Sequence, residues 1–205
     1  MINWRMVGTE VSALGAAALS MPLRFVVEHD SYDPGAPQAT PVVLVHGFLG
    51  DPTNLLVMRR YLAARGVGSF ATFAYAPRLD YQRLACRLGD VVDAVCVAAG
   101  VDEVDVVGHS LGGLVARYLV EIAPATPVRR LVTLGAPYFA SCLPAHELAI
   151  FGAADPFIPA PHPDYGPYHR NPDARTVVVP ECGHWGLLYH PTVLRETADF
   201  LCAAG

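Results

Sequence analysis

Residues 101–121 read "VDEVDVVGHSLGGLVARYLVE", and this stretch decides the fold. The run VDVV is typical of a buried strand, whereas the residues after Ser110 have the apolar spacing of a helix. A serine at so sharp a corner is pushed into the open, and Gly108 and Gly112 remove side-chain bulk that would stop the turn from closing. The stretch therefore predicts a strand–turn–helix unit with Ser110 exposed at its tip.

The composition indicates one folded domain with a large core. The chain has 205 residues, of which 53% are hydrophobic and 16% charged. A net charge of −5 argues against a nucleic-acid partner, which requires a basic surface. We expect residues 41–205 to form a single catalytic domain, preceded by a helical or extended segment, residues 1–40, that packs on it.

The N-terminal segment resembles a signal peptide only weakly, because Glu10 interrupts its apolar run. That run is also too short and too broken to span a bilayer. We predict an amphipathic helix that lies on the body of the protein, and transient attachment to a lipid surface is the alternative left open. We expect a monomer, and favour the cytoplasm over secretion.

Strand-like and helix-like stretches alternate along the rest of the chain. Helices are expected at 54–66, 80–100, 112–123 and 192–203, and strands at 41–47, 69–76, 104–110, 129–137, 148–155 and 175–181. Such alternation, with strands apolar on both faces, predicts an α/β fold: a mostly parallel sheet of about six strands with helices on both faces. Only about ten residues separate Pro137 from Leu148, so we expect no cap domain there, and residues 156–173 are expected to form a loop.

A serine hydroxyl is a poor nucleophile until a base accepts its proton. We predict His184 as that base, since it follows the last strand in a glycine-flanked loop, and Asp155, at the end of the preceding strand, as the carboxylate that orients it. The chain order Ser, Asp, His is the one expected for this architecture. The rivals are His46, His109 and His190 for the base, and Asp164, Asp173 and Glu181 for the carboxylate.

The developing negative charge on a substrate carbonyl oxygen needs preorganised N–H donors. The backbone N–H of Leu111, immediately after the nucleophile, is one candidate. The other is the N–H of Phe48 in the sequence "VHGFLGD", where Gly47 lets the backbone approach the substrate. The sequence thus predicts an oxyanion hole made by Phe48 and Leu111.

Several motifs taken together resemble the α/β-hydrolase superfamily, and within it the small bacterial lipases and esterases that lack a lid. They are "PVVLVHGFLGDPTNLLVMRRYLAARG", "VDVVGHSLGGLVARYLV", "RRLVTLGAP", "GAADPFIP" and "CGHWGLLYHPTV", and they cover residues 41–203. The resemblance implies hydrolysis of carboxylic esters through an acyl-enzyme on Ser110, with His184 as general base and acid and Asp155 as its partner. By the same resemblance, Phe48 and Leu111 form the oxyanion hole. The stretch after "LGAP" and the Pro-rich loop 156–173 depart from the pattern, which leaves the preferred substrate open.

Apolar residues near the predicted strand ends are candidates for an acyl-binding wall, which suits a small-molecule ester or a lipid as substrate. They are Phe48, Leu49, Tyr138, Phe139, Phe157, Ile158, Tyr165, Trp185 and Leu187. We expect no cofactor. We also expect no metal, because His162, Asp164 and His169 have irregular spacing among prolines. The five cysteines lack CxxC pairing and are expected to be reduced, with a structural disulfide as the alternative.

Other activities remain open alongside ester hydrolysis. A thioesterase, an acyltransferase or an amidase would use the same nucleophile on the same scaffold. A non-catalytic binding protein that keeps the fold is a further alternative, against which the presence of Ser110, Asp155 and His184 argues.

Overall fold

The computed structural model describes residues 10–12, 15, 30–76, 79–137, 146–161 and 174–203. These residues form one six-stranded sheet in the order β2-β1-β3-β4-β5-β6, and every neighbouring pair is parallel. The strands are β1 Val42–Val45, β2 Phe70–Phe73, β3 Val104–His109, β4 Val128–Leu134, β5 Glu147–Gly152 and β6 Arg175–Val179. The α/β fold expected from the sequence is confirmed.

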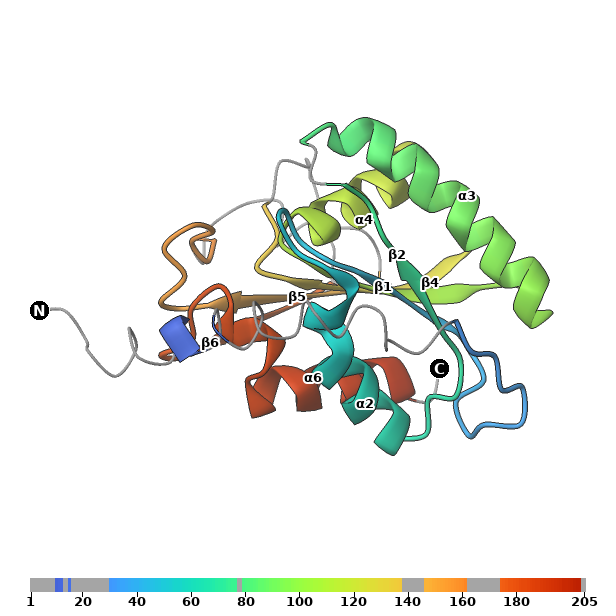
Figure 1. Ribbon diagram of the computed structural model, residues 1–205, viewed down its shortest axis with the longest axis horizontal. Coiled ribbons are helices and arrows are strands. Elements are labelled where there is room, and N and C mark those ends of the chain that lie inside the picture. The colour runs from blue at the N-terminus through green and yellow to red at the C-terminus, as the bar shows by residue number, and fades with distance from the viewer. Residues whose placement is uncertain are drawn as a thin grey trace, which may run out of the picture.

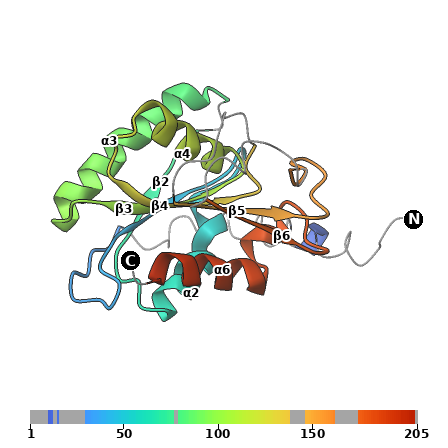
Figure 2. The ribbon, with the colours of Figure 1, turned by 180° about the vertical axis from the view of Figure 1, so that it is seen from behind.

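Helices cover both faces of this sheet (Figure 1), and the view from behind shows the same two layers (Figure 2). One face carries α2 and α6 and the other α3 and α4; their bounds are α2 Leu56–Ala64, α3 Tyr81–Ala99, α4 Leu111–Ile122 and α6 Pro191–Cys202. Two 3₁₀ turns complete the described elements, η2 Pro52–Leu55 and η3 Gly186–Leu188. Asp80 caps the start of α3, and Gly100, with φ +68°, ends it in the left-handed conformation that glycine adopts without strain.

The core lies on both sides of the sheet because successive strand residues point to opposite faces. In β1, Val42 and Leu44 belong to the cluster under α2 and α6, whereas Val43 and Val45 belong to the cluster under α3 and α4. The edge strand β6 departs from the expected two-sided burial, since Val178 is 45% exposed. An edge strand has a neighbour on one side only, so fewer of its side chains are covered.

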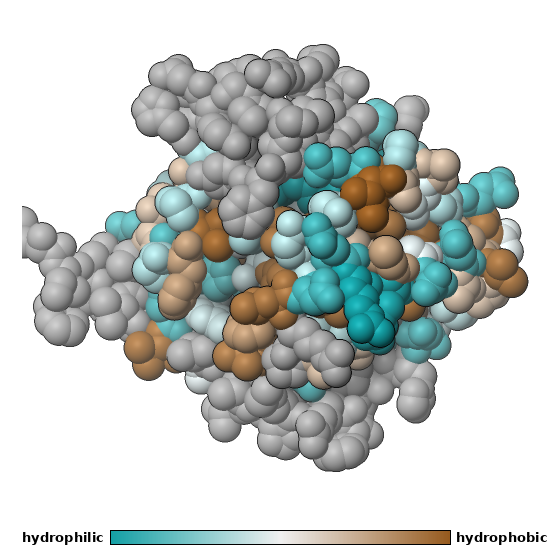
Figure 3. Space-filling view, turned by 90° about the horizontal axis from the view of Figure 1, so that it is seen from above, coloured by the Kyte–Doolittle hydropathy of each residue, from teal (hydrophilic) through white to brown (hydrophobic). Residues whose placement is uncertain are grey.

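Helix α3 shows how an amphipathic stretch joins this architecture. Leu84, Leu88, Val92 and Val95 recur at helical spacing, and all four are buried against the sheet and α4. The surface seen from above shows hydrophilic residues interspersed with hydrophobic ones (Figure 3). The apolar stripe predicted for residues 80–100 is therefore the inner face of this helix.

Several expectations fall on residues outside those described. These are most of the segment 1–40, the stretch 138–145 with Tyr138, Phe139 and Cys142, and the loop 162–173 with His162, Asp164, Tyr165, His169 and Asp173. The packing of most of the N-terminal segment, the expected absence of a cap domain and most of the Pro-rich loop thus stay predictions. In the described part of the chain, Cys86, Cys96, Cys182 and Cys202 are free thiols, and no helix there has the length and apolar character needed to cross a bilayer.

The strand order places a topological switch in the middle of the sheet. From β1 the chain moves to β2 on one side, and the next strand, β3, then pairs with β1 on the other side. Loops that leave two adjacent parallel strands in opposite directions open a crevice at their carboxyl ends, where ligands bind in open α/β sheets. Gly47 follows β1 and Ser110 follows β3, so both lie at this crevice.

Candidate active site

Ser110 occupies a strained turn between β3 and α4. Its backbone angles are φ 53° and ψ −120°, a region that L residues rarely adopt and that costs about 1–3 kcal/mol. A Cβ at Gly108 would lie 2.6 Å from the amide nitrogen of Gly113, and one at Gly112 would collide with the carbonyl oxygens of Val45 and His46. Helix and sheet therefore meet backbone to backbone, and this close packing holds Ser110 in its turn.

Asp155 and His184 form a hydrogen-bonded pair at the ends of β5 and β6. Nδ1 of His184 lies 2.6 Å from Oδ2 of Asp155, and both residues are buried. The other carboxylate oxygen, Oδ1, accepts the backbone N–H groups of Phe157 at 2.8 Å and Ile158 at 2.9 Å. The carboxylate is thus fixed on both oxygens, and the pairing of Nδ1 leaves Nε2 of His184 for another partner.

Gly135, after β4, lies directly beside this pair. Its φ is +55°, and a Cβ there would lie 3.2 Å from both Oδ2 of Asp155 and Nδ1 of His184, and 2.8 Å from Cδ1 of Leu187. A larger residue would be strained and would also press on the Asp155–His184 contact. The glycine of the "LGAP" motif therefore makes room for the pair, a role that the sequence analysis did not assign.

His109, which precedes Ser110 in the chain, contacts His184. Nε2 of His109 donates to the carbonyl oxygen of His184 at 3.1 Å, and the two rings lie 4.8 Å apart between centroids. Among the described residues, no hydrogen bond joins the Ser110 hydroxyl to the His184 ring. Burial, and then the proximity of His184, lower the pKa of His109 to about 3, so this ring is neutral near pH 7.

The loop after β1 is anchored by the second buried histidine, His46. The backbone N–H of Tyr75 donates to its Nε2 at 3.3 Å, so Nδ1 carries the hydrogen and donates to the carbonyl oxygen of Gly47 at 2.9 Å. The Tyr75 hydroxyl donates to the carbonyl of His46 at 2.5 Å, and the rings stack with centroids 4.2 Å apart. Burial lowers the pKa of His46 and raises that of Tyr75. As neutral groups, His46 thus holds the Gly47–Phe48 peptide and Tyr75 holds the His46–Gly47 peptide.

The two backbone amides expected to form an oxyanion hole belong to Leu111, which follows Ser110 in the chain, and to Phe48, whose neighbour Gly47 packs against Ser110. Leu111 begins α4, and the first N–H groups of a helix have no acceptor within the helix. Phe48 follows Gly47, at which a Cβ would lie only 3.0 Å from Cβ of Ser110. Because the peptide bond is trans and planar, the N–H of Phe48 points away from the Gly47 carbonyl that His46 holds.

The candidate acyl wall divides into exposed and buried residues. Phe48, Leu49 and Phe157 are 37%, 63% and 66% exposed, and the ring of Phe157 packs edge-on against His184 at 5.5 Å. Ile158 and Trp185 are partly buried. Leu187 was expected in the wall, but the turn η3 directs it into the core, where it is 0% exposed and offers no surface to a substrate.

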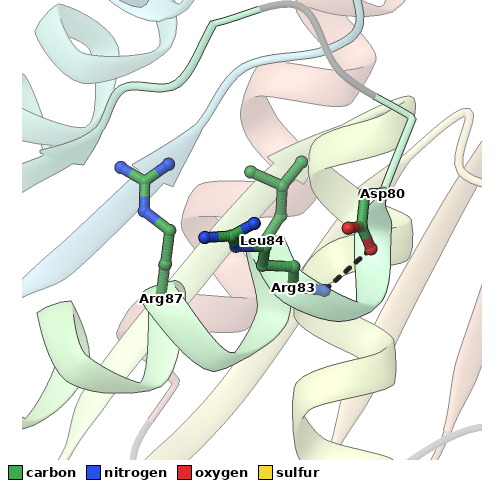
Figure 4. Close-up of a pocket in the computed structure, with 4 residues that line it drawn as sticks. All are labelled: Asp80, Arg83, Leu84 and Arg87. Carbon is green, nitrogen blue, oxygen red and sulfur yellow. Dashed lines mark hydrogen bonds between the residues drawn. The ribbon is translucent and has the colours of Figure 1, made fainter.

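A hollow of about 290 Å³ lies at the start of α3 (Figure 4). The described residues that line it are Asp80, Arg83, Leu84 and Arg87. Asp80 accepts the backbone N–H of Arg83, and the guanidinium of Arg87 lies 5.6 Å from the ring of Phe73 at the end of β2. Neither Ser110 nor the Asp155–His184 pair contributes to this hollow.

The rival residues have other places in the structure. His46 and His109 are committed to the backbone contacts above, and His190 caps α6 by accepting the N–H of Thr192. Glu181 follows β6 and has φ 52°. In the described part of the chain, no three His, Cys, Asp or Glu side chains are grouped so that they could hold a metal ion.

One contact to the His184 loop comes from a residue that the sequence analysis considered only as an interruption of an apolar run. The carboxylate of Glu10 accepts the backbone N–H groups of Trp185 at 3.1 Å and Gly186 at 2.9 Å. The only local signal for this contact is the pair of glycines in "CGHWG", and it does not reveal which residue fills the space they leave.

Comparisons with known proteins find similarity to a thioesterase family and to a lipase. The family model of palmitoyl protein thioesterases matches residues 41–142, which include Ser110 but neither Asp155 nor His184. A triacylglycerol lipase from Burkholderia plantarii is 32% identical over 133 residues. The aligned part is 60% of this chain and 36% of the lipase, so the chain spans little more than a third of that relative.

Solved structures give the fold. Aspergillus fumigatus lipase B has a TM-score of 0.69 at 14% identity, covering 85% of this chain and 55% of that one. An α/β hydrolase enzyme from a sediment metagenome of the Mar Chica lagoon, Morocco, has a TM-score of 0.63 at 20% identity, covering 83% and 95%. A thermophilic esterase from Thermogutta terrifontis has a TM-score of 0.62 at 15% identity, and the match covers 84% of this chain and 91% of the esterase. The chain therefore has the α/β-hydrolase fold and resembles the lipases and esterases that share it.

Proposed function

We propose that this protein is a serine hydrolase that cleaves carboxylic esters through an acyl-enzyme on Ser110. His184 accepts the hydroxyl proton on Nε2 as Oγ attacks the ester carbonyl carbon, and the N–H groups of Phe48 and Leu111 stabilise the oxyanion. The intermediate collapses, the C–O bond to the alcohol breaks, and His184 returns the proton to the departing oxygen. Water then attacks the acyl carbon with its proton taken by the same nitrogen, and release of the acid restores Ser110.

The observation that carries this proposal is the 2.6 Å hydrogen bond between Asp155 and His184. Nδ1 bound to a carboxylate fixes the ring so that Nε2 is the free, basic nitrogen, and the charge of Asp155 stabilises the imidazolium that forms in the reaction. Ser110 stands at the same edge of the sheet, since β3, β5 and β6 are parallel. Hydroxyl and ring are not hydrogen-bonded here, and such contacts often tighten only when substrate is bound.

Exposed apolar residues near the site support an acyl or aromatic ester as substrate. Phe48, Leu49 and Phe157 together present apolar surface that water contacts in the free protein. Covering this surface with an acyl chain would gain about 25 cal/mol for each Å² removed from water. A charged acyl group would gain no such energy and would lose its hydration.

Hydrolysis of p-nitrophenyl esters of graded chain length tests the proposal. We expect Ser110→Ala to lower kcat by at least about 10³-fold, and a phosphonate ester to label Ser110 in the wild-type protein. Ser31→Ala is the matched control, because Ser31 pairs with Phe70 at the opposite, amino end of β2. Wild-type rates in Ser110→Ala would refute the mechanism.

A second candidate is a thioesterase, which the family match favours. A thioester differs from an ester in its leaving group, and the same three side chains would serve both reactions. Acyl thioesters and oxygen esters of the same chain length, assayed side by side, separate the two. We expect the larger kcat/KM for oxygen esters, and a larger value for thioesters across the series would favour the second candidate.

A further inference from the structure

Glu10 lies against the loop that carries His184, although the two are far apart in the chain. Each oxygen of its carboxylate accepts one of two consecutive backbone amides: Oε2 that of Trp185 at 3.1 Å, and Oε1 that of Gly186 at 2.9 Å. Residues 10–12 are helical, and both ribbon views show this short stretch beside the loop that leads to α6 (Figures 1 and 2). Hydrogen bonds to an ionised carboxylate are roughly twice as strong as those between neutral groups.

The two glycines that flank His184 and Trp185 make room for this carboxylate. A Cβ at Gly183 would collide with Cδ of Glu10 and lie 2.6 Å from Cγ and Oε1. A Cβ at Gly186 would lie 2.8 Å from Oε1. Side chains at either position would therefore displace Glu10, so the "CGHWG" pattern and Glu10 fit one another.

Three separate contacts hold the backbone around His184. Its own carbonyl oxygen accepts from His109, and the carbonyl of Cys182 accepts the N–H of Ala154. Glu10 binds the two residues that follow His184. Since the imidazole must meet a hydroxyl at hydrogen-bond distance, a shift of about 1 Å in this backbone can lower the rate about 10²-fold.

We propose that Glu10 is a positioning residue, which fixes the loop 183–186 so that the His184 ring is held for its reaction with Ser110. The proposal rests on the function proposed above for its catalytic consequence. Its structural part, the hold of Glu10 on the loop, does not depend on any activity.

Two readouts without substrate test that structural part in the full-length chain. Hydrogen exchange of peptides containing Trp185 and Gly186 is expected to be at least about tenfold faster in Glu10→Ala than in wild type. The downfield proton resonance of the Asp155–His184 hydrogen bond is expected to broaden.

Glu10→Gln keeps the shape but turns an N–H donor toward a backbone N–H, so it should give an intermediate result. Glu121→Ala, an exposed change on α4, is the matched control and should match wild type. Unchanged exchange and an unchanged resonance in Glu10→Ala would overturn the proposal.

Ester hydrolysis tests the catalytic part. In Glu10→Ala we expect kcat to fall about 10- to 100-fold with KM within about twofold of wild type. The two amide donors remain in this variant, so added acetate should restore part of kcat in a saturable way, whereas chloride at the same ionic strength should not. A normal kcat in Glu10→Ala would overturn the positioning role. If the wild type and Ser110→Ala are equally inactive, the proposed function fails instead, and exchange and resonance still decide whether Glu10 holds the loop.

Discussion

The His109 ring donates from Nε2 to the backbone carbonyl of His184, 3.1 Å away, so one histidine of the site holds the main chain of the other. His109 is 2% exposed and neutral, and His46 is equally buried beside it in the crevice. Both are built into the fold as uncharged rings. Since both rings are neutral in the folded protein, their protonation at low pH favours the unfolded chain, and the site is lost with the fold.

We expect the free energy of unfolding to fall as the pH is lowered from 7 to 5. The pKa of His109 is lowered to about 3 in the folded state, whereas an unfolded histidine has a pKa of about 6.5. Protons thus bind the unfolded chain first, and the stability present above about pH 6.5 is lost progressively toward pH 3. At pH 5 the loss from His109 alone is about 2 kcal/mol, and the lowered pKa of His46 adds to it.

Denaturant unfolding between pH 5 and 8 measures this loss. His109→Gln should show a shallower slope of stability against pH than wild type. His146→Asn is the control, because His146 is exposed and asparagine tolerates its φ of +57°. An equal slope in wild type and His109→Gln would contradict the prediction.

Asp155→Asn should lower kcat by about 10⁴-fold with little change in fold. The amide oxygen can still accept from Phe157 and Ile158, so the loop keeps its anchor. The amide nitrogen, however, would face Nδ1 of His184 and favour the wrong tautomer. Steady-state kinetics measures the fall in kcat, and far-UV circular dichroism checks that the fold is kept. A fall in kcat of less than tenfold would speak against Asp155 as the orienting carboxylate.

Gly135→Ala should reduce both stability and kcat, because it adds strain at φ +55° and pushes on the Asp155–His184 pair. Gly100→Ala separates the two effects, since Gly100 has φ +68° but open space around its Cβ position. In each variant, backbone strain should lower the free energy of unfolding by about 1–2 kcal/mol. Only Gly135→Ala should also lose activity, and equal kcat in the two variants would count against this role.

The buried guanidinium of Arg117 on α4 forms an ion pair with the buried carboxylate of Glu147 on β5. Arg117→Met should destabilise the fold by about 3–5 kcal/mol, because it leaves that carboxylate without its cation. Arg117 and Glu147 are 1% and 0% exposed, and Arg117 also donates to the carbonyl of Pro137 and to Thr133. The double variant Arg117→Met, Glu147→Gln should recover much of the loss. Arg65→Met breaks the exposed pair with Asp199 and should change stability by less than about 1 kcal/mol, as thermal unfolding can show.

The fold could be predicted from the sequence because alternating apolar strands and helices have few ways to bury both faces of a sheet. The meeting of Asp155 and His184 could be anticipated for a similar reason: the carboxyl ends of parallel strands share one edge. Ser110 was recognisable because the glycines beside it permit close contact of helix and sheet.

Other features depended on contacts between distant segments. Leu187 was placed in the acyl wall because its neighbours are apolar and follow a strand, but one 3₁₀ turn suffices to direct it inward. Glu10 read as a break in an apolar run, since nothing in its own neighbourhood indicates two amide donors. The role of Gly135 depends on two residues far along the chain, Asp155 and His184, which its own neighbourhood does not indicate.

The backbone strain at Ser110 lowers the stability of the fold at the position of the proposed nucleophile. A serine at φ 53° is strained, whereas glycine is not. Ser110→Gly is therefore expected to raise the free energy of unfolding while it removes the proposed nucleophile. Selection for heat tolerance alone would then tend to replace the residue on which the proposed hydrolysis depends.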